Sequence, residues 1–225
     1  RTGPAIFAKA TIIPLSDFED EQLLAIKPTR TAGEYCWTCT PSIILYSIRK
    51  FGLSNCTYLD ADLFFYADPT VLIEEAKGAS VIITPHRYSP MYEDSESGGT
   101  YCVQFVYFKN SPEGIAVLEW WRAACIDWCY DRREPGRFGD QKYLDIWTTM
   151  FTGVHVLEHL GGGIAPWNVQ QYDFEHKIGQ VWGKELAGQH LFPVIFYHFH
   201  ALKYAEKNSF VPAGTYVMTD NDIEL

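Results

Sequence analysis

The sequence predicts an α/β domain in which a mixed, mainly parallel sheet is flanked by helices. Patterns typical of strands alternate with patterns typical of helices along most of the 225 residues, and this alternation favours a sheet covered on both faces. The chain is 47% hydrophobic and 16% aromatic, which is enough for a sizeable core. No repeat or linker divides it, so we expect a single domain over residues 1–225.

Three elements are expected before the first acidic cluster. Residues 5–14 are rich in isoleucine and end in a proline, which predicts a strand. Residues 16–26 predict a helix, because Ser16 and Glu19 have the spacing of a capping box. Residues 41–51 carry apolar side chains at helical spacing and precede a glycine, so a second helix is expected there.

The middle of the chain alternates between strand and helix. The apolar residues 57–59 predict a buried strand, and residues 69–76, led by a proline, predict the helix after it. Residues 80–84 and 101–108 are the next expected strands. A long helix with an aromatic face is expected over residues 113–130.

The last third continues the same alternation. Residues 140–147 predict a helix and residues 154–157 a short strand. The glycine run 161–163 opens an expected flexible loop that ends at Asn168. Residues 191–198 are the last strong strand, so a strand end again precedes polar residues.

Two carboxylates stand one residue apart where the buried strand 57–59 ends. Side chains two residues apart on an extended chain point to the same side, so Asp60 and Asp62 can share one small volume. That arrangement is costly unless a cation lies between them, and Mg²⁺ or Mn²⁺ would leave positions open for a phosphate. A solvated turn or a helix cap is the alternative, but the apolar flanks favour the metal site.

Other polar residues also follow predicted strands. Ligands of such sheets bind beyond the carboxyl ends of the strands, so we expect His86, Arg87, His198 and His200 to converge with the aspartates. Period-two spacing puts both late histidines on one side, although each could be a hydrogen-bonded core residue. Lys203 could meet a phosphate as a point charge or remain solvated.

Two further segments carry polar side chains suited to sugars. Asp140 and Gln141 follow two glycines at an expected helix start. Asp140 can be a plain helix cap, or the pair can bind sugar hydroxyls, which need paired donors and acceptors. Trp167 and Asn168 end the glycine-rich loop, and the tryptophan can stack on a sugar or belong to the core.

Charge and hydropathy exclude several classes of protein. The 28 acidic and 18 basic residues give a formal charge of −10, which argues against a nucleic-acid binder. No apolar run reaches the length of a transmembrane helix. The first residues do not resemble a secretory signal, so we expect a cytoplasmic protein, with or without peripheral attachment to the inner membrane.

The cysteines allow two interpretations. A C-x₂-C pair and a C-x₃-C pair could in principle form a Cys₄ zinc site. Their aromatic surroundings favour reduced thiols in the core instead, so we expect no zinc. The six cysteines are Cys36, Cys39, Cys56, Cys102, Cys125 and Cys129.

Four motifs occur in the order known from one family. They are Leu59-Asp60-Ala61-Asp62, Gly139-Asp140-Gln141-Lys142, Pro166-Trp167-Asn168 and the segment from His198 to Lys203. In these the chain resembles bacterial GT-A fold glycosyltransferases related to glycogenin and the lipopolysaccharide galactosyltransferases, over roughly residues 16–205. The resemblance implies one Rossmann-like domain and metal-dependent, retaining transfer of a sugar from a nucleotide diphosphate, usually UDP, to a hydroxyl of a glycan, lipid-linked or protein acceptor.

The resemblance also implies a role for individual residues. Asp60 and Asp62 would bind Mn²⁺ or Mg²⁺ and the UDP-sugar. His198 would be a third metal ligand, with His200 as the alternative. Lys203 would approach the phosphates, as Arg87 could from its own strand end.

Asp140 and Gln141 match the family's contacts to the donor sugar, and Gln104 can stand in for an amide of a family strand. Ala201 replaces a glycine that is usual in the family. Part of the N-terminal strand region that holds the base would be missing. A nucleophilic and a front-face mechanism both stay open, and the alternatives are a metal-dependent phosphohydrolase and a non-catalytic sugar- or nucleotide-binding module.

Overall fold

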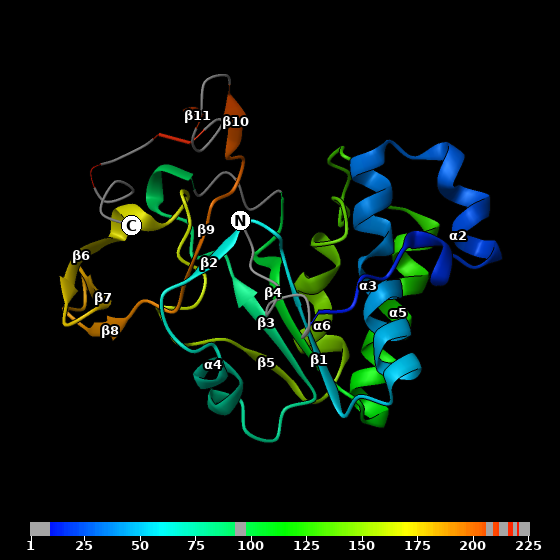
Figure 1. Cartoon of the computed structure of the whole chain (residues 1–225), viewed down its shortest axis with the longest axis horizontal. Coiled ribbons are helices and arrows are strands. Elements are labelled where there is room, and N and C mark those ends of the chain that lie inside the picture. The colour runs from blue at the N-terminus through cyan, green and yellow to red at the C-terminus, as the bar shows by residue number, and fades with distance from the viewer. Residues whose placement is uncertain (1–9, 93–97, 206–208, 212–215, 218–219, 221–225) are drawn as a thin grey trace.

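The computed structural model describes residues 10–92, 98–205, 209–211, 216–217 and 220. The strand expected over residues 5–14 lies partly outside these residues, and its described part, residues 10–14, is not a strand. The described chain forms an α/β structure in which helices pack on both faces of a central sheet (Figure 1).

The central sheet has four strands in the order β1-β4-β3-β5. They are β1 (Asn55–Leu59), β3 (Val81–Pro85), β4 (Tyr101–Lys109) and β5 (Val154–Val156). The sheet is mixed, as predicted. The expectation of mainly parallel pairing is wrong for the described ladders, because β4 lies between β1 and β3 and runs antiparallel to both. Only the β3–β5 ladder is parallel. Strands β1, β3 and β5 nevertheless point the same way, so their carboxyl ends share one edge.

Helices α3 (Ala32–Phe51) and α5 (Pro112–Asp127) cover one face of this sheet (Figure 1). Apolar side chains from both helices and from β3 and β4 form the largest core cluster, together with Trp147. The predicted helix start at residue 41 is wrong. A capping box between Thr31 and Glu34 begins α3, and Pro41 lies inside the helix, where the packing of its neighbours outweighs one missing hydrogen bond. The following glycine ends the helix at φ 60, as expected.

Two other helix predictions need correction. The expected capping box at Ser16 is absent, because a short 3₁₀ turn η1 (Leu15–Asp17) occupies that place and Asp20 caps α2 (Glu21–Ile26). The 3₁₀ turn η2 (Lys27–Thr29) follows. The expected helix over residues 140–147 is a 3₁₀ segment η4 (Lys142–Ile146) that continues into α6 (Trp147–Met150). Asp140 is therefore not a helix cap.

The opposite face of the sheet packs against α4 (Thr70–Glu75) and a two-stranded ladder of β2 (Leu63–Phe65) with β9 (Phe196–His198). The strand expected over residues 191–198 is split. Its first part, β8 (Leu191–Pro193), pairs in another sheet, and residues 194–195 separate it from β9. A proline at the end of β8 cannot donate to a ladder, which is consistent with the break.

The remaining strands form two small antiparallel sheets that the sequence analysis did not predict. One contains β6 (Tyr172–Lys177), β7 (Gln180–Glu185) and β8, and it follows the 3₁₀ turn η5 (Val169–Gln171). The other pairs β10 (Lys203–Ala205) with β11 (Ser209–Val211). Figure 1 shows both on the side of the molecule away from α3 and α5.

The glycine run 161–163 is part of the packed core rather than a flexible loop. A Cβ on Gly161 would lie 1.9 Å from the carbonyl oxygen of Pro193, and one on Gly162 would lie 2.7 Å from Leu157. Residues 161–168 are all buried. The glycines therefore let this segment pass close to the end of β8 and to Leu157, which positions Trp167 and Asn168.

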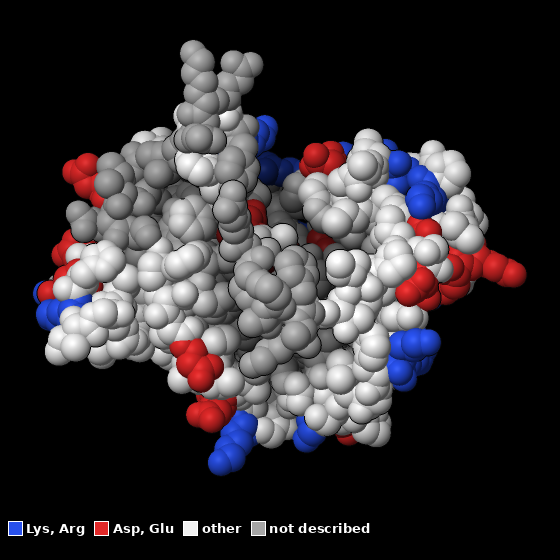
Figure 2. All heavy atoms as spheres, viewed as in Figure 1, with Lys and Arg blue, Asp and Glu red and all other residues white. Residues whose placement is uncertain are grey.

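None of the described helices combines the length and the apolar character that crossing a bilayer requires. On the face shown in Figure 2, Lys and Arg atoms are scattered and form no continuous stripe.

Candidate metal centre and cleft

The end of β1 positions the aspartate pair. The backbone N–H of Asp60 donates to the carbonyl of Gln104 at 3.0 Å, which extends the β1–β4 pairing by one residue. The hydroxyl of Tyr58 donates to Oδ1 of Asp60 at 2.9 Å. The chain then turns into β2, so Asp60 and Asp62 both lie at the edge where β1, β3 and β5 end.

The β2–β9 ladder brings His198 to the aspartates. Leu63 is paired with His198 in this ladder, and the N–H of Phe199 donates to the carbonyl of Asp62 at 2.9 Å. The N–H of His198 also donates to the carbonyl of Ile164 at 2.8 Å. Backbone hydrogen bonds to Asp62 on one side and Ile164 on the other therefore hold His198 close to the two aspartates, which lie more than half the chain away in the sequence.

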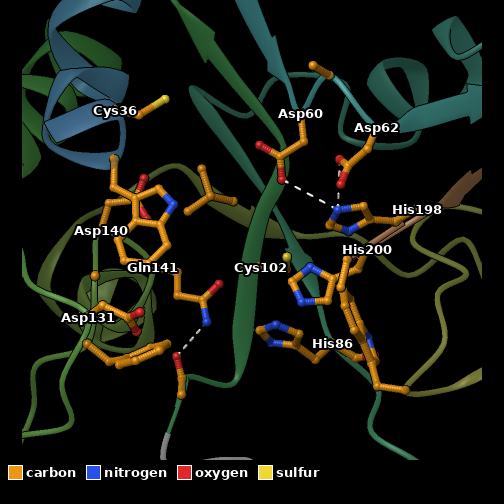
Figure 3. A pocket seen from close by; sticks show the side chains of 18 of the residues that line it. Cys36, Asp60, Asp62, His86, Cys102, Asp131, Asp140, Gln141, His198 and His200 are labelled. Carbon is orange, nitrogen blue, oxygen red and sulfur yellow. Dashed lines mark hydrogen bonds and ion pairs between the residues drawn. The ribbon is translucent and has the colours of Figure 1, made fainter. Parts of the chain in front are cut away.

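Asp60, Asp62 and His198 form a group that could hold a metal ion. Their ligand atoms all lie within 4.8 Å of one another. His198 Nε2 is 3.0 Å from Oδ1 of Asp62 and 3.8 Å from Oδ2 of Asp60 (Figure 3). The imidazole is almost fully buried, whereas Asp62 is partly exposed and open to a ligand. We call these three residues the triad.

The pKa values of the two aspartates are shifted in opposite directions. Burial raises the pKa of Asp60, and the negative charge of Asp62 adds to this, although His198 and the Tyr58 hydroxyl oppose it. Burial also raises the pKa of Asp62, but the hydrogen bond and charge of His198 outweigh that effect, so the pKa lies below its usual value. A cation between the carboxylates would favour the ionised form of both.

Trp167 supports the histidines of the site. Its ring packs edge-on against His198 at 5.3 Å and against His200 at 5.4 Å between centroids. Its Nε1–H donates to the carbonyl of His86 at 2.9 Å. The side-chain N–H of Asn168 donates to the same carbonyl at 2.8 Å. Trp167 and Asn168 are thus buried parts of the framework, and the ring edge of Trp167 also lines the cleft.

The structure separates the roles of the three histidines. His198 belongs to the triad, whereas His200 lines the cleft beside it without joining that group. Burial lowers the pKa of His200, and the charge of His198 lowers it further. His86 also lines the cleft, where burial lowers its pKa to about 3, so its imidazole is neutral.

A cleft of about 800 Å³ extends from the triad to a facing wall, which is within the range of small-molecule sites. In the space-filling view, acidic atoms are visible in a hollow on this face (Figure 2). The facing wall includes Asp140 and Gln141, with Cys36 of α3 beside them (Figure 3). Trp37 of α3 also lines the cleft. Gln141 is held by a hydrogen bond from Nε2 to the carbonyl of Gly98 at 2.8 Å.

Asp140 is a buried carboxyl group that faces the triad. Burial raises its pKa to about 7, and the negative charge of Asp60 contributes to the shift. Gly139 just before it adopts φ 51, and a Cβ there would lie 3.4 Å from the ring of Trp37. Gly139 thus places Asp140 in the wall through its left-handed backbone beside Trp37, which is a different reason from the expected helix start.

This shift predicts a pH dependence of stability. Asp140 binds a proton in the folded chain up to about pH 7 but ionises near pH 4 when unfolded. The folded state therefore holds more protons between these values, and stability falls as the pH rises, by at most about 1.4 kcal/mol per pH unit. Asp140→Asn should remove this slope in urea denaturation of the metal-free chain. An unchanged slope between pH 4.5 and 7.5 would contradict the shift.

Three predicted site residues lie elsewhere. The guanidinium of Arg87 donates to the carbonyls of Gly162 and Leu157, each at 2.7 Å, and the residue does not line the cleft. Lys203 is exposed in β10 and also does not line the described cleft. Gln104 is fully buried in β4, and neither of its side-chain polar atoms has a hydrogen-bond partner within the described part of the chain.

The cysteines are distributed over different parts of the structure. Cys36 lines the cleft, whereas Cys39 packs in a small cluster with Leu23. Cys125 and Cys129 lie in the main core. Within the described residues, only the triad has ligand atoms close enough to hold a metal ion. The described structure therefore gives no geometric support for a zinc site formed by the cysteines.

Several cleft residues were missed by the sequence analysis. Tyr88, Tyr216, Arg133 and Phe138 line the cleft, but none belongs to one of the four motifs. The only signal was the position of Tyr88 two residues after His86. Ala201, which also lines the cleft, adopts φ 63, the left-handed conformation that a glycine would take more easily.

Comparison with known proteins identifies two similar chains, while no family model matches. The chain is 33% identical over 204 residues to the protein called "Uncharacterized protein YfnD" of Bacillus subtilis (strain 168), covering 89% of this chain and 64% of that protein. It is 34% identical over 206 residues to "Uncharacterized protein YfnF" of the same strain, covering 88% and 66%. The chain thus spans somewhat less than two thirds of the length of these relatives.

Proposed function

We propose that the protein is a metal-dependent glycosyltransferase that moves a sugar from a nucleotide diphosphate, UDP in the first instance, to an acceptor hydroxyl. The observation that carries the proposal is the triad at the common end of β1, β3 and β5, facing Asp140 and Gln141 across one cleft. These residues belong to the motifs in which the chain resembles the GT-A fold glycosyltransferases.

The chemistry of the triad fits a hard or borderline divalent cation. Two carboxylates and one imidazole within 4.8 Å offer oxygen and nitrogen ligands, and the imidazole favours Mn²⁺ over Mg²⁺. When bound, the metal would act as a Lewis acid and neutralise charge on the diphosphate leaving group. The partly exposed Asp62 leaves the triad accessible from the cleft.

The residues of the facing wall would orient the sugar. Gln141 has one amide N–H committed to Gly98 and can offer its carbonyl oxygen and second N–H to hydroxyl groups. Asp140, with its pKa near 7, can hold a proton as a donor or accept one from a hydroxyl at neutral pH. Gln104 lies buried behind the edge of the sheet, so Asp140 is the better-placed of the two to face the anomeric carbon.

A nucleotide-release assay tests this function. The chain is incubated with UDP-sugars and Mn²⁺, with and without EDTA, and both UDP and inorganic phosphate are measured. We expect UDP release that requires the metal, because the diphosphate leaves with the nucleotide. Release of inorganic phosphate would indicate a metal-dependent phosphohydrolase instead. Binding of UDP and Mn²⁺ without turnover of any UDP-sugar would indicate a non-catalytic binding module.

A further inference from the structure

The described residues that line the cleft carry one fixed positive charge. Of the described residues that line it, Arg133 is the only arginine or lysine, whereas four are aspartates: Asp60, Asp62, Asp131 and Asp140. Neither Arg87 nor Lys203, the cations expected from the sequence, lines this cleft. The rest of the cleft is acidic. An anionic group of a ligand would therefore be attracted to Arg133.

Arg133 differs from the arginines near it in the chain. Arg132 pairs with Glu134 at 2.7 Å, and Arg137 pairs with Asp127 at 3.7 Å. Arg133 forms no ion pair or hydrogen bond among the described residues, although Asp131 lines the same cleft. Among the described residues, each neighbouring guanidinium thus has a carboxylate partner, and the one that lines the cleft has none.

Aromatic side chains lie near the Arg133 guanidinium. It lies over the ring of Phe138, 5.7 Å from the centroid, an arrangement that favours a cation. Burial raises the pKa of Tyr88 and of Tyr216, and the positive charge of Arg133 opposes both shifts. Arg133 is therefore close enough to act on hydroxyl groups that also line the cleft.

We propose that Arg133 binds a carboxylate or phosphate carried by the sugar acceptor. The inference rests on the proposed function, in which the donor diphosphate occupies the triad. The triad is formed by the ends of β1 and β9, whereas Arg133 and Phe138 belong to the segment between α5 and η4. With the donor diphosphate held at the triad, an anion at Arg133 would be a second anionic group, and the sugar acceptors that carry one are uronic acids and sugar phosphates.

Binding of three simple sugars tests this proposal. Dissociation constants for glucuronate, glucose 6-phosphate and glucose are measured by saturation-transfer NMR, with and without Mn²⁺ and UDP. We expect at least one anionic sugar to bind more tightly than glucose, and the tighter of the two shows whether carboxylate or phosphate is preferred. Arg133→Gln should weaken that anionic sugar about three- to tenfold and leave glucose unchanged. Arg132→Gln, the matched control, should change neither.

Two outcomes would overturn the proposal. One is equal binding of glucose and both anionic sugars by the unmodified chain. The other is a loss of Mn²⁺–UDP affinity in Arg133→Gln, which would assign the guanidinium to the donor diphosphate. The proposed transferase function is tested separately. If binding of the anionic sugar depends on Arg133 but no UDP-sugar is turned over, the anion site is supported and the transferase function is contradicted.

Discussion

Replacing Asp62 by asparagine should abolish metal-dependent turnover while the chain stays folded. The change keeps the shape of the side chain but removes the charge of the most accessible triad ligand. We expect turnover of a UDP-sugar to fall by at least a hundredfold. Loss of a residue that only hydrogen-bonds to a metal ligand already lowers metal affinity or activity about 10- to 100-fold, and Asp62 would be a ligand itself.

Thermal denaturation measures the same loss without an acceptor. A ligand at one hundred times its dissociation constant stabilises the folded state by about 2.7 kcal/mol, or roughly 5–10 °C for a domain of this size. Mn²⁺ with UDP should produce such a shift in the unmodified chain and not in Asp62→Asn. Asp68→Asn is the matched control, because Asp68 accepts from the N–H of Thr70 and does not line the cleft. A full shift in the Asp62 variant would exclude the triad as the metal site.

The two late histidines extend this experiment. His198→Gln should lose most of the response to Mn²⁺, whereas His200→Gln should retain it, because only His198 reaches both aspartates. If both variants respond as the unmodified chain does, the imidazole is not a ligand.

Replacing Arg87 by methionine should destabilise the fold by about 3 kcal/mol. The guanidinium holds the carbonyls of Gly162 and Leu157, and charge-assisted hydrogen bonds are worth about 1.5–3 kcal/mol each when buried acceptors are left without a partner. Methionine keeps the apolar stem, so the loss reports the hydrogen bonds. Urea denaturation at constant pH measures the change.

The matched control is Arg132→Met, which breaks an exposed ion pair with Glu134 and should cost less than about 1 kcal/mol. The Arg87 result also separates two roles for this residue. A phosphate contact would raise the KM for the donor with little change in stability. That result would contradict the structural role and support the interpretation based on the sequence.

The ends of β1 and β3 were predicted correctly, whereas the direction of the Arg87 side chain after β3 was not. Apolar runs ending in polar residues located Asp60 and His86 at one edge, because β1 and β3 run the same way. The expectation that the strand before Asp60 is buried was wrong, because β1 is an edge strand with exposed or only partly buried residues. Arg87 was expected at that edge too. Its backbone adopts φ 49, which turns the side chain toward the glycine segment instead. A sequence pattern does not reveal such a local turn.

Other parts of the site depend on strand pairing and ion pairing, which cannot be read from a single sequence. His198 and His200 have the same spacing and surroundings in the sequence, and only the register of β2 on β9 distinguishes them. The direction of β4 was missed because a buried strand has the same apolar pattern whether it runs parallel or antiparallel. Arg133 was missed because its significance depends on which neighbouring arginines find carboxylates.

The pairing of β2 with β9 also determines when the site forms during folding. More than half of the chain lies between the two strands, including the whole of β3, β4 and α5. Contacts of such large sequence separation form slowly, because a long loop must close before they stabilise the chain. A folding intermediate with the central sheet and its helices in place would therefore have both aspartates but no nearby His198. Capture of Mn²⁺ during refolding would thus report closure of the last ladder rather than collapse of the core.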